Sequence, residues 1–316
     1  MFHMYLIKPF SFIFILIISI YSPYKAFIEH IPVYEDTRIE INSGESINEV
    51  FSKITTLNIV NKLFLKILIR SNNLNLIQHG EYDITNKSIK NIIINMNNGN
   101  TVTHKIKINE GITIFDLENL LNQSFLINDC SFLKCLETKY SFNEGILYPD
   151  TYYYKKGMTA SSILIKSHKR LDEYLNNNIN NKSMNKEDIL ILASIIEKEA
   201  GNDEEKLKIS GVFLKRLSIN MKLQADPTII YGLLPNFDGD IKKSDILNRN
   251  NKYNTYMING LPPTPISISS LSSIDAAING LPGEYLFFVA DSPTSHYFSK
   301  TYEEHVNKIK ELGLNK

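Results

Sequence analysis

Two glutamates at the end of one apolar segment are the side chains of this chain best suited to acid chemistry. Residues 192–201 read LASIIEKEAG, so Glu197 and Glu199 follow directly on apolar residues. A carboxyl group on an apolar helix face is costly to ionise, so it tends to keep its proton at neutral pH. Such a group can act as a general acid, for example in the cleavage of a glycosidic bond.

A polar cluster follows in the stretch LQADPTIIYG at 223–232. A sugar presents hydroxyl and amide groups that need hydrogen-bond donors and acceptors. We therefore expect Gln224, Asp226 and Thr228 to line a polar cleft. For Asp226 the alternative is that it only caps a helix with Pro227 in its first turn.

An ordered loop is predicted further along the chain, from YNTY at 253–256 and GLPPTP at 260–265. Its tyrosine rings could carry the apolar face of a sugar. The alternative is a rigid proline loop that only covers the core.

The helix that must position the two glutamates is predicted to begin after Asn185, a suitable cap, and to end at Gly201. The helical period places Glu199 at one margin of an apolar face and Glu197 at the other, with Lys198 toward solvent. That apolar face comprises Ile189, Leu192, Ala193, Ile196 and Ala200. The pattern leaves both glutamates open as the acid, and it also allows both to be solvated or ion-paired.

Several other elements are expected around this helix. A second helix at 211–217 would pack on it, and a buried strand at 286–290 could pair with residues 296–299. Thr301 would cap a last helix. For His296 and His305 we favour structural hydrogen bonds over substrate contact.

The N-terminus reads as a membrane anchor. Residues from Pro9 to Tyr24 carry no charge and lie between Lys8 and Lys25, near the short limit for a spanning helix. We interpret 1–25 as an uncleaved signal anchor followed by a linker at 26–37. A cleaved signal peptide and a buried core helix are the alternatives.

Residues 38–100 have the pattern of a small LysM-like α+β subdomain. A short strand begins at Arg38, and Ser46 with Glu49 forms a capping box for a helix. A second helix around 59–72 and a strand after Gly80 complete a strand–helix–helix–strand order. A generic small α+β domain would show the same order of strands and helices.

Residues 101–316 are expected to form a larger α+β domain. It starts with a strand at 102–108 and a helix at 111–121 capped by Thr113.

Composition excludes some functions. The chain has 316 residues with 34 basic and 34 acidic side chains, so no basic excess indicates nucleic-acid binding. No spacing of His, Cys and carboxylates fits a metal-ligand set, and no cofactor is implied. Cys130 and Cys135 are expected to be structural, either free or locally bridged.

Six sequence blocks in a specific order resemble the endolytic murein transglycosylase (YceG-like) family. They are EGILYPDTY at 144–152, LASIIEKEAG at 192–201, LQADPTIIYG at 223–232, YNTYMINGLPPTPI at 253–266, YLFFVAD at 285–291 and HYFSKTYEEH at 296–305. The catalytic glutamate of the family is the second in the E-K-E triplet, which matches Glu199. Ala225 and the stretch 269–273 depart from the family pattern without affecting the chemistry.

The resemblance implies a lyase-type enzyme that cleaves the β-1,4 bond between N-acetylmuramic acid and N-acetylglucosamine and leaves 1,6-anhydro-muramyl ends. Glu199 would act as acid and then as base. Glu197 lies two positions earlier and diverges from it on a helix, which favours a single-acid mechanism. Glu197 would then orient its neighbours or raise the Glu199 pKa. The expected substrate-binding residues are Glu197, Gln224, Asp226, Thr228, Tyr231, Tyr253, Asn254, Thr255, Tyr256, Pro262 and His296.

The resemblance also sets the expected cellular context. The chain would be a single-pass protein of the bacterial inner membrane, with its bulk outside the cytoplasm. It would act on nascent peptidoglycan, terminate glycan strands and work with peptidoglycan synthases. Rival interpretations are a hydrolase, a non-catalytic membrane-anchored wall-binding protein, and a scaffold of the elongation or division machinery.

Overall fold

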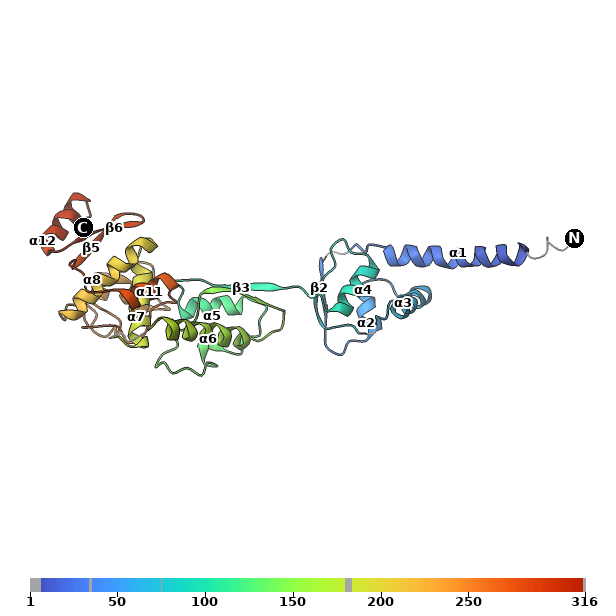
Figure 1. Cartoon of the computed structure of the whole chain (residues 1–316), viewed down its shortest axis with the longest axis horizontal. Helices are drawn as coiled ribbons and strands as arrows, with labels where there is room; N and C mark the ends of the chain where they lie inside the picture. The colour runs from blue at the N-terminus through green and yellow to red at the C-terminus, as the bar shows by residue number, and fades with distance from the viewer. Residues whose placement is uncertain (1–6, 34–35, 75, 180–183, 315–316) are drawn as a thin grey trace. The chain divides into compact units, whose positions relative to one another are not determined.

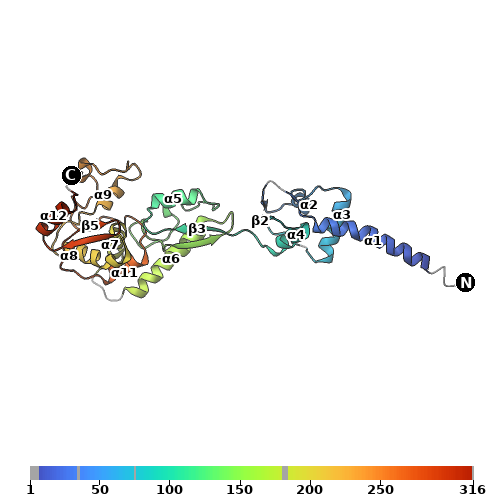
Figure 2. The same ribbon diagram turned by 90° about the horizontal axis from the view of Figure 1, so that it is seen from above.

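The computed structural model describes residues 7–33, 36–74, 76–179 and 184–314, with the backbone alone at 7–17. The chain forms two compact units, residues 1–104 with 154–156 and residues 105–153 with 157–316 (Figures 1 and 2). Helices dominate both units, and the strands occur in two-stranded sheets. The expected α+β class is therefore confirmed.

The N-terminal unit places four helices around one antiparallel strand pair, β1 with β2. The capping box of Ser46 and Glu49 starts α2 as predicted, because each supplies a side-chain acceptor for the other's backbone N–H. The core includes Phe51, Leu68 and Met96. The elements are α1 (Ile7–Glu29), β1 (Arg38–Ile41), α2 (Ile47–Ser52), α3 (Ile59–Ser71), β2 (Gly80–Asp83) and α4 (Ile89–Asn98).

Helix α1 continues further than the sequence suggested. The rings of Tyr24 and Phe27 lie 5.7 and 5.8 Å from that of Phe64, and Ile28 is buried. The linker predicted at 26–37 was therefore wrong at its start, because burial of Phe27 and Ile28 extends the helix to Glu29. Across the described residues, no helix combines the length and apolar character needed to cross a membrane. Residues 1–6 of the predicted anchor lie outside the described part.

The remaining elements lie in the larger unit, apart from one end residue in each of two strands. They are β3 (His104–Ile108), α5 (Ile114–Asn122), a 3-10 turn (Ser131–Leu133), β4 (Asp150–Tyr154), α6 (Ala160–Asn178), α7 (Lys186–Glu199), a 3-10 turn (Asp203–Glu205), α8 (Lys206–Ser218), α9 (Asp226–Leu233), α10 (Lys243–Ile246), α11 (Leu271–Asn279), β5 (Phe287–Ser292), β6 (Ser295–Ser299) and α12 (Tyr302–Glu311). His104 of β3 and Tyr154 of β4 belong to the N-terminal unit instead. Strands β5 and β6 pair as predicted, in antiparallel orientation, but the prediction that β5 would be buried was wrong, because its first half is only partly covered and its second half is exposed. Cys130 and Cys135 form a disulfide.

Helix α7 is the central helix of this unit. Every residue from Ile189 to Ile196 is buried, because α8, α9 and α11 pack around it. The prediction that only one face would be apolar and buried was wrong for this reason. A helix that is packed on all sides has little freedom to shift, so the position of its last turn and of the side chains on it is fixed.

The two ends of α7 are set differently. Asn185 caps the start, as predicted, by accepting the N–H of Asp188. At the other end Gly201 does not adopt the left-handed conformation of a glycine cap. A Cβ at Gly201 would lie 2.7 Å from the carbonyl carbon of Thr294, and Asn202 Nδ2 donates to the Thr294 carbonyl at 2.6 Å. Glycine is thus required where the β5–β6 turn passes the end of α7.

Candidate functional site

A cavity of about 440 Å³ lies at the end of α7. Its walls come from α7, α8, the start of α9, the loop at Tyr256, the β5–β6 hairpin and α12. The lining residues are Glu199, Arg216, Leu223, Gln224, Asp226, Tyr256, Phe287, Phe288, Val289, Ala290, His296, Tyr302 and His305. Five residues expected at the site from the sequence meet here: Glu199, Gln224, Asp226, Tyr256 and His296.

Glu199 is the acid of this cavity. The pKa of its carboxyl group is raised to about 8, chiefly by burial and also by the negative charge of Asp226, while Arg216 opposes the shift. At neutral pH the group is therefore mostly protonated. Of the two glutamates that the helical pattern left open, Glu199 is the one with the properties of a general acid.

Asp226 is an acidic residue that lines the same cavity as Glu199. Its carboxylate accepts a hydrogen bond of 2.7 Å from the Tyr256 hydroxyl. Burial and the Asp226 charge raise the pKa of Tyr256, so this hydroxyl stays protonated and keeps donating. The alternative role of Asp226 as a helix cap was wrong, because α9 begins at Asp226 itself and Ala225 occupies the cap position.

Gln224 adopts a strained backbone conformation beside the acid. Its φ is +50°, in the left-handed region that non-glycine residues rarely occupy. Its N–H donates to the Thr255 carbonyl at 3.2 Å, and the Ala225 N–H donates to Thr255 Oγ1 at 2.9 Å. Such strain persists only where the surroundings enforce it, and it is common at functional sites.

Thr228 and Thr255 lie behind the cavity wall. Both are fully buried, and their hydroxyl oxygens are 2.9 Å apart. Neither lines the cavity. They fix the backbone that presents Gln224 and Asp226, which differs from the direct substrate contact expected from the sequence.

Arg216 is a buried cation of the site that sequence reasoning missed. Only 6 % of its surface is exposed. Its Nε donates to the Leu286 carbonyl at 2.7 Å and its Nη1 to the Leu223 carbonyl at 2.6 Å. The guanidinium therefore joins α8 to the start of β5 and to the segment before α9. Lys215 and Arg216 are adjacent basic residues of one helix, so the sequence around them does not indicate that Arg216 is the buried one.

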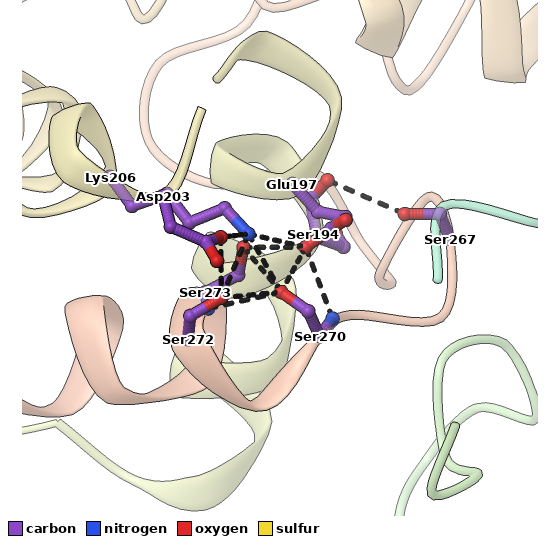
Figure 3. A network of polar contacts seen from close by, with 8 residues as sticks. All are labelled: Ser194, Glu197, Asp203, Lys206, Ser267, Ser270, Ser272 and Ser273. Atoms are coloured by element: carbon purple, nitrogen blue, oxygen red, sulfur yellow. Dashed lines mark hydrogen bonds and ion pairs between the residues drawn. The ribbon is translucent and has the colours of Figure 1, made fainter. Parts of the chain in front are cut away.

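Glu197 belongs to a different polar cluster (Figure 3). Its carboxylate accepts from Ser270 Oγ at 2.5 Å and from Ser273 Oγ at 2.6 Å, and Lys206 Nζ lies 3.4 Å away. Burial alone would raise the pKa of Glu197, but these hydrogen bonds and the lysine charge together lower it below its ordinary value. Glu197 is therefore ionised and joins the end of α7 to the starts of α8 and α11. It lines a separate cavity of about 540 Å³ with Lys206, Ser270 and Ser272.

Tyr231 and Tyr253 lie together outside the Glu199 cavity. Their ring centroids are 4.8 Å apart, and the Tyr231 hydroxyl donates to Glu144 at 2.9 Å. Glu144, another group that the sequence did not single out, also accepts the Ile114 N–H at 2.8 Å. Burial raises the pKa of Glu144 to about 7. This carboxyl group links α5 to α9, outside the cavity that holds Glu199.

Asn254 and Pro262 are two further expected site residues that the structure places elsewhere. Asn254 is fully buried, and its Nδ2 donates to the carbonyls of Asp245, Ile246 and Asn248 at 3.0–3.1 Å. Pro262 borders another cavity, near α7 and α8. Neither lines the Glu199 cavity.

The two histidines differ. His296 lines the cavity and is fixed by Glu205, which accepts its backbone N–H at 2.7 Å and lies 2.8 Å from its Nδ1. The expected structural hydrogen bond is confirmed there. For His305 it was wrong: within the described residues its buried Nδ1 has no hydrogen-bond partner, and the ring stacks on Phe287 at 5.2 Å. Burial and the Arg216 charge lower the pKa of His305, so it stays neutral at pH 7.

Comparison with known proteins places these features in a family context. A model of the YceG-like family matches residues 39–311. The chain is 36 % identical over 176 residues to a protein of Bacillus subtilis named endolytic murein transglycosylase, an alignment that covers 54 % of this chain and 48 % of that protein. A Streptococcus pneumoniae protein of the same name is 31 % identical over 175 residues, covering 53 % of this chain and 32 % of the relative. The alignments thus span a third to a half of the curated relatives.

A solved structure is similar over a longer range. The crystal structure of a YceG-like protein from Listeria monocytogenes superposes with a TM-score of 0.56 at 29 % identity, covering 85 % of this chain and 97 % of that one. The similarity therefore extends well beyond the stretch aligned with the curated relatives.

Proposed function

This chain belongs to the YceG-like family, and from that premise we propose that it is an endolytic lytic transglycosylase of peptidoglycan. It cleaves the β-1,4 bond between N-acetylmuramic acid and N-acetylglucosamine and leaves a 1,6-anhydro-muramyl end. The names of the two curated relatives support this activity. The observation that carries the proposal is the protonated Glu199 in a cavity lined by polar and aromatic side chains.

The proposed mechanism uses one carboxyl group twice. Protonated Glu199 donates its proton to the glycosidic oxygen as the bond from that oxygen to C1 breaks. The C6 hydroxyl of the same muramyl residue then attacks C1, and the Glu199 carboxylate accepts the hydroxyl proton. No water is consumed. Asp226 favours the protonated form that starts the cycle, and Arg216 favours the carboxylate that follows proton donation.

Substrate contacts are proposed for the residues that line this cavity. Gln224, Asp226, Tyr256 and His296 supply polar groups, and Phe288 supplies an aromatic face for a sugar ring. The other residues expected from the sequence do not line this cavity; among them, Thr228, Thr255 and Asn254 hold the surrounding backbone through buried hydrogen bonds. Glu197 belongs with these, since it points into the serine and lysine cluster.

The cellular context is a finer part of the proposal. We infer attachment to the inner membrane through residues 1–25, supported by the uncharged run from Pro9 to Tyr24. A LysM-like role for residues 38–100 is supported by the order β1, α2, α3, β2. Termination of nascent strands beside peptidoglycan synthases would follow from such a location. Fractionation of cells that express the full chain tests the attachment: recovery in the soluble fraction would contradict it.

Product analysis tests the activity itself. Purified full-length protein is incubated with sacculi, and the released muropeptides are examined by mass spectrometry. Anhydro-muramyl ends are expected. Reducing ends would indicate a hydrolase, and binding without any release would favour a non-catalytic wall-binding protein.

The pH dependence of the reaction follows from the Glu199 pKa. Activity should fall on the alkaline side with an apparent pKa near 8, because the free enzyme loses the donating proton there. Asp226→Asn should move this limb to lower pH, since removing a nearby negative charge makes the carboxylate easier to form. Arg216→Met should move it to higher pH. The measurement is kcat/KM against pH for the three proteins, and shifts in the same direction would contradict the assignment.

A further inference from the structure

Helix α3 of the N-terminal unit presents a second apolar face that nothing in the described part of the unit covers. Phe64, Leu65 and Leu68 are buried in the core. Ile59, Leu63 and Ile67 follow one another four residues apart on another face and are 88 %, 55 % and 38 % exposed, with Val60 beside them at 53 %. A cluster of exposed large aliphatic side chains on one helix is typical of a surface that binds an apolar partner.

A basic stripe runs beside this apolar face. Lys62, Lys66 and Arg70 are exposed and also lie four residues apart, and α3 contains no acidic residue. Within the part of the chain that the structure describes, none of the three forms an ion pair. They border a groove of about 310 Å³ between α2 and α3, whose floor includes Phe51 and Leu65. The groove thus combines an apolar floor with three positive charges.

The apolar face of α1 adjoins α3. Tyr24 and Phe27 contact Phe64 of α3, so these two helices pack directly. Ile20 and Tyr21 lie one turn earlier on the same side of α1 and are exposed. The exposed apolar surface of α3 therefore continues along α1 to Ile20 and Tyr21, which the rest of the described unit does not cover.

We propose that α3 docks the N-terminal unit on the surface of a lipid bilayer that contains anionic phospholipid. The stripe of Ile59, Leu63 and Ile67 enters the boundary between headgroups and acyl chains, while the basic stripe binds the lipid phosphates. Apolar and Lys/Arg-rich faces on one helix are the combination that interfacial helices use. The three cations favour an anionic lipid over a neutral protein surface. This inference goes beyond the proposed activity and does not depend on Glu199.

The absence of tryptophan from the chain allows a direct test. The full-length Leu63→Trp variant carries a single fluorescent reporter on the apolar stripe, and Leu247→Trp, at a position 57 % exposed in the other unit, is the matched control. Both proteins are reconstituted with vesicles of phosphatidylcholine alone or mixed with phosphatidylglycerol, in which some lipids carry bromine as a short-range quencher. Circular dichroism verifies that each variant is folded.

The proposal predicts a blue-shifted and quenched fluorescence signal from the Leu63→Trp variant in vesicles that contain phosphatidylglycerol, with the control unquenched. Combining Leu63→Trp with Lys62→Glu, Lys66→Glu and Arg70→Glu should reduce the bound fraction of the reporter at least about tenfold. Equal signals from Leu63→Trp and the control in every vesicle would overturn the docking. Quenching that is the same with and without phosphatidylglycerol would overturn the recognition of anionic lipid. Anhydro product formation is measured separately, so failure of the proposed activity would be recognised independently.

Discussion

Replacing Glu199 with Gln is expected to abolish the formation of anhydro-muramyl products while leaving the fold intact. Gln has the shape of a protonated Glu and carries no charge, so it fits the buried site, but it cannot donate a proton. General acid–base catalysis contributes roughly 10²–10⁴-fold, so a loss of at least that size is expected. The measurement is the initial rate of anhydro product release from sacculi.

The matched control for this variant is Glu204→Gln, which makes the same chemical change at an exposed position. It should retain the activity of the parent protein. A Glu199→Gln protein that keeps more than about a tenth of the parent activity would contradict the single-acid mechanism, since loss of the acid should cost far more.

The same variant should alter stability in a pH-dependent way. The folded-state pKa of Glu199 is raised to about 8 from an ordinary value of 4.5, so between these pH values the folded protein holds a proton that the unfolded chain releases. The free energy of unfolding of the parent therefore falls as pH rises through this window, by on the order of 1 kcal/mol per pH unit. Glu199→Gln removes this slope. Urea unfolding at several pH values should show the variant gaining stability relative to the parent as pH increases.

Replacing Glu197 with Ala is expected to lower the free energy of unfolding by about 3 kcal/mol, because it removes one partner of a buried ion pair. Lys206 and the hydroxyls of Ser270 and Ser273 would lose their shared acceptor. Lys206 would keep its ion pair with Asp203 at 2.7 Å. Since this cluster fixes the last turn of α7, kcat should fall together with stability. Urea unfolding and steady-state kinetics measure the two effects.

A surface glutamate provides the control. Glu173→Ala breaks an exposed pair with Lys169 at 3.8 Å and should cost no more than about 0.5 kcal/mol. If Glu197→Ala left stability unchanged and raised only KM, Glu197 would contact substrate, as the sequence suggested. The folded-state pKa of Glu197 is lowered, so its stabilising contribution should be present at neutral pH and lost as the pH falls through that lowered value.

Much of the local structure could be predicted from the sequence, because its causes are local. Asn185, Thr113 and Thr301 cap the helices that they were expected to cap, since each needs only its own side chain and an N–H three residues later. The all-round burial of α7 could not be predicted. It depends on which helices pack against α7, and helical periodicity does not encode that arrangement.

The candidate site was predictable in part for the same reason. Glu199, Gln224 and Asp226 lie in two short polar stretches that stand out from apolar surroundings. Arg216 and Phe288 join them only through tertiary contacts, and in the sequence they look like ordinary helix and strand residues. The different protonation states of Glu197 and Glu199 could not be predicted either, because the hydrogen bonds that lower the Glu197 pKa come from serines more than seventy residues away in the sequence.

The most direct test of the central claim is the origin of the oxygen at the new sugar end. Full-length protein digests sacculi in water enriched in heavy oxygen, and the masses of the released muropeptides are determined. The mechanism at Glu199 predicts anhydro-muramyl ends without the heavy isotope, because the C6 hydroxyl displaces the leaving sugar. Incorporation of heavy oxygen at a reducing muramyl end during cleavage would contradict the account and identify the enzyme as a hydrolase.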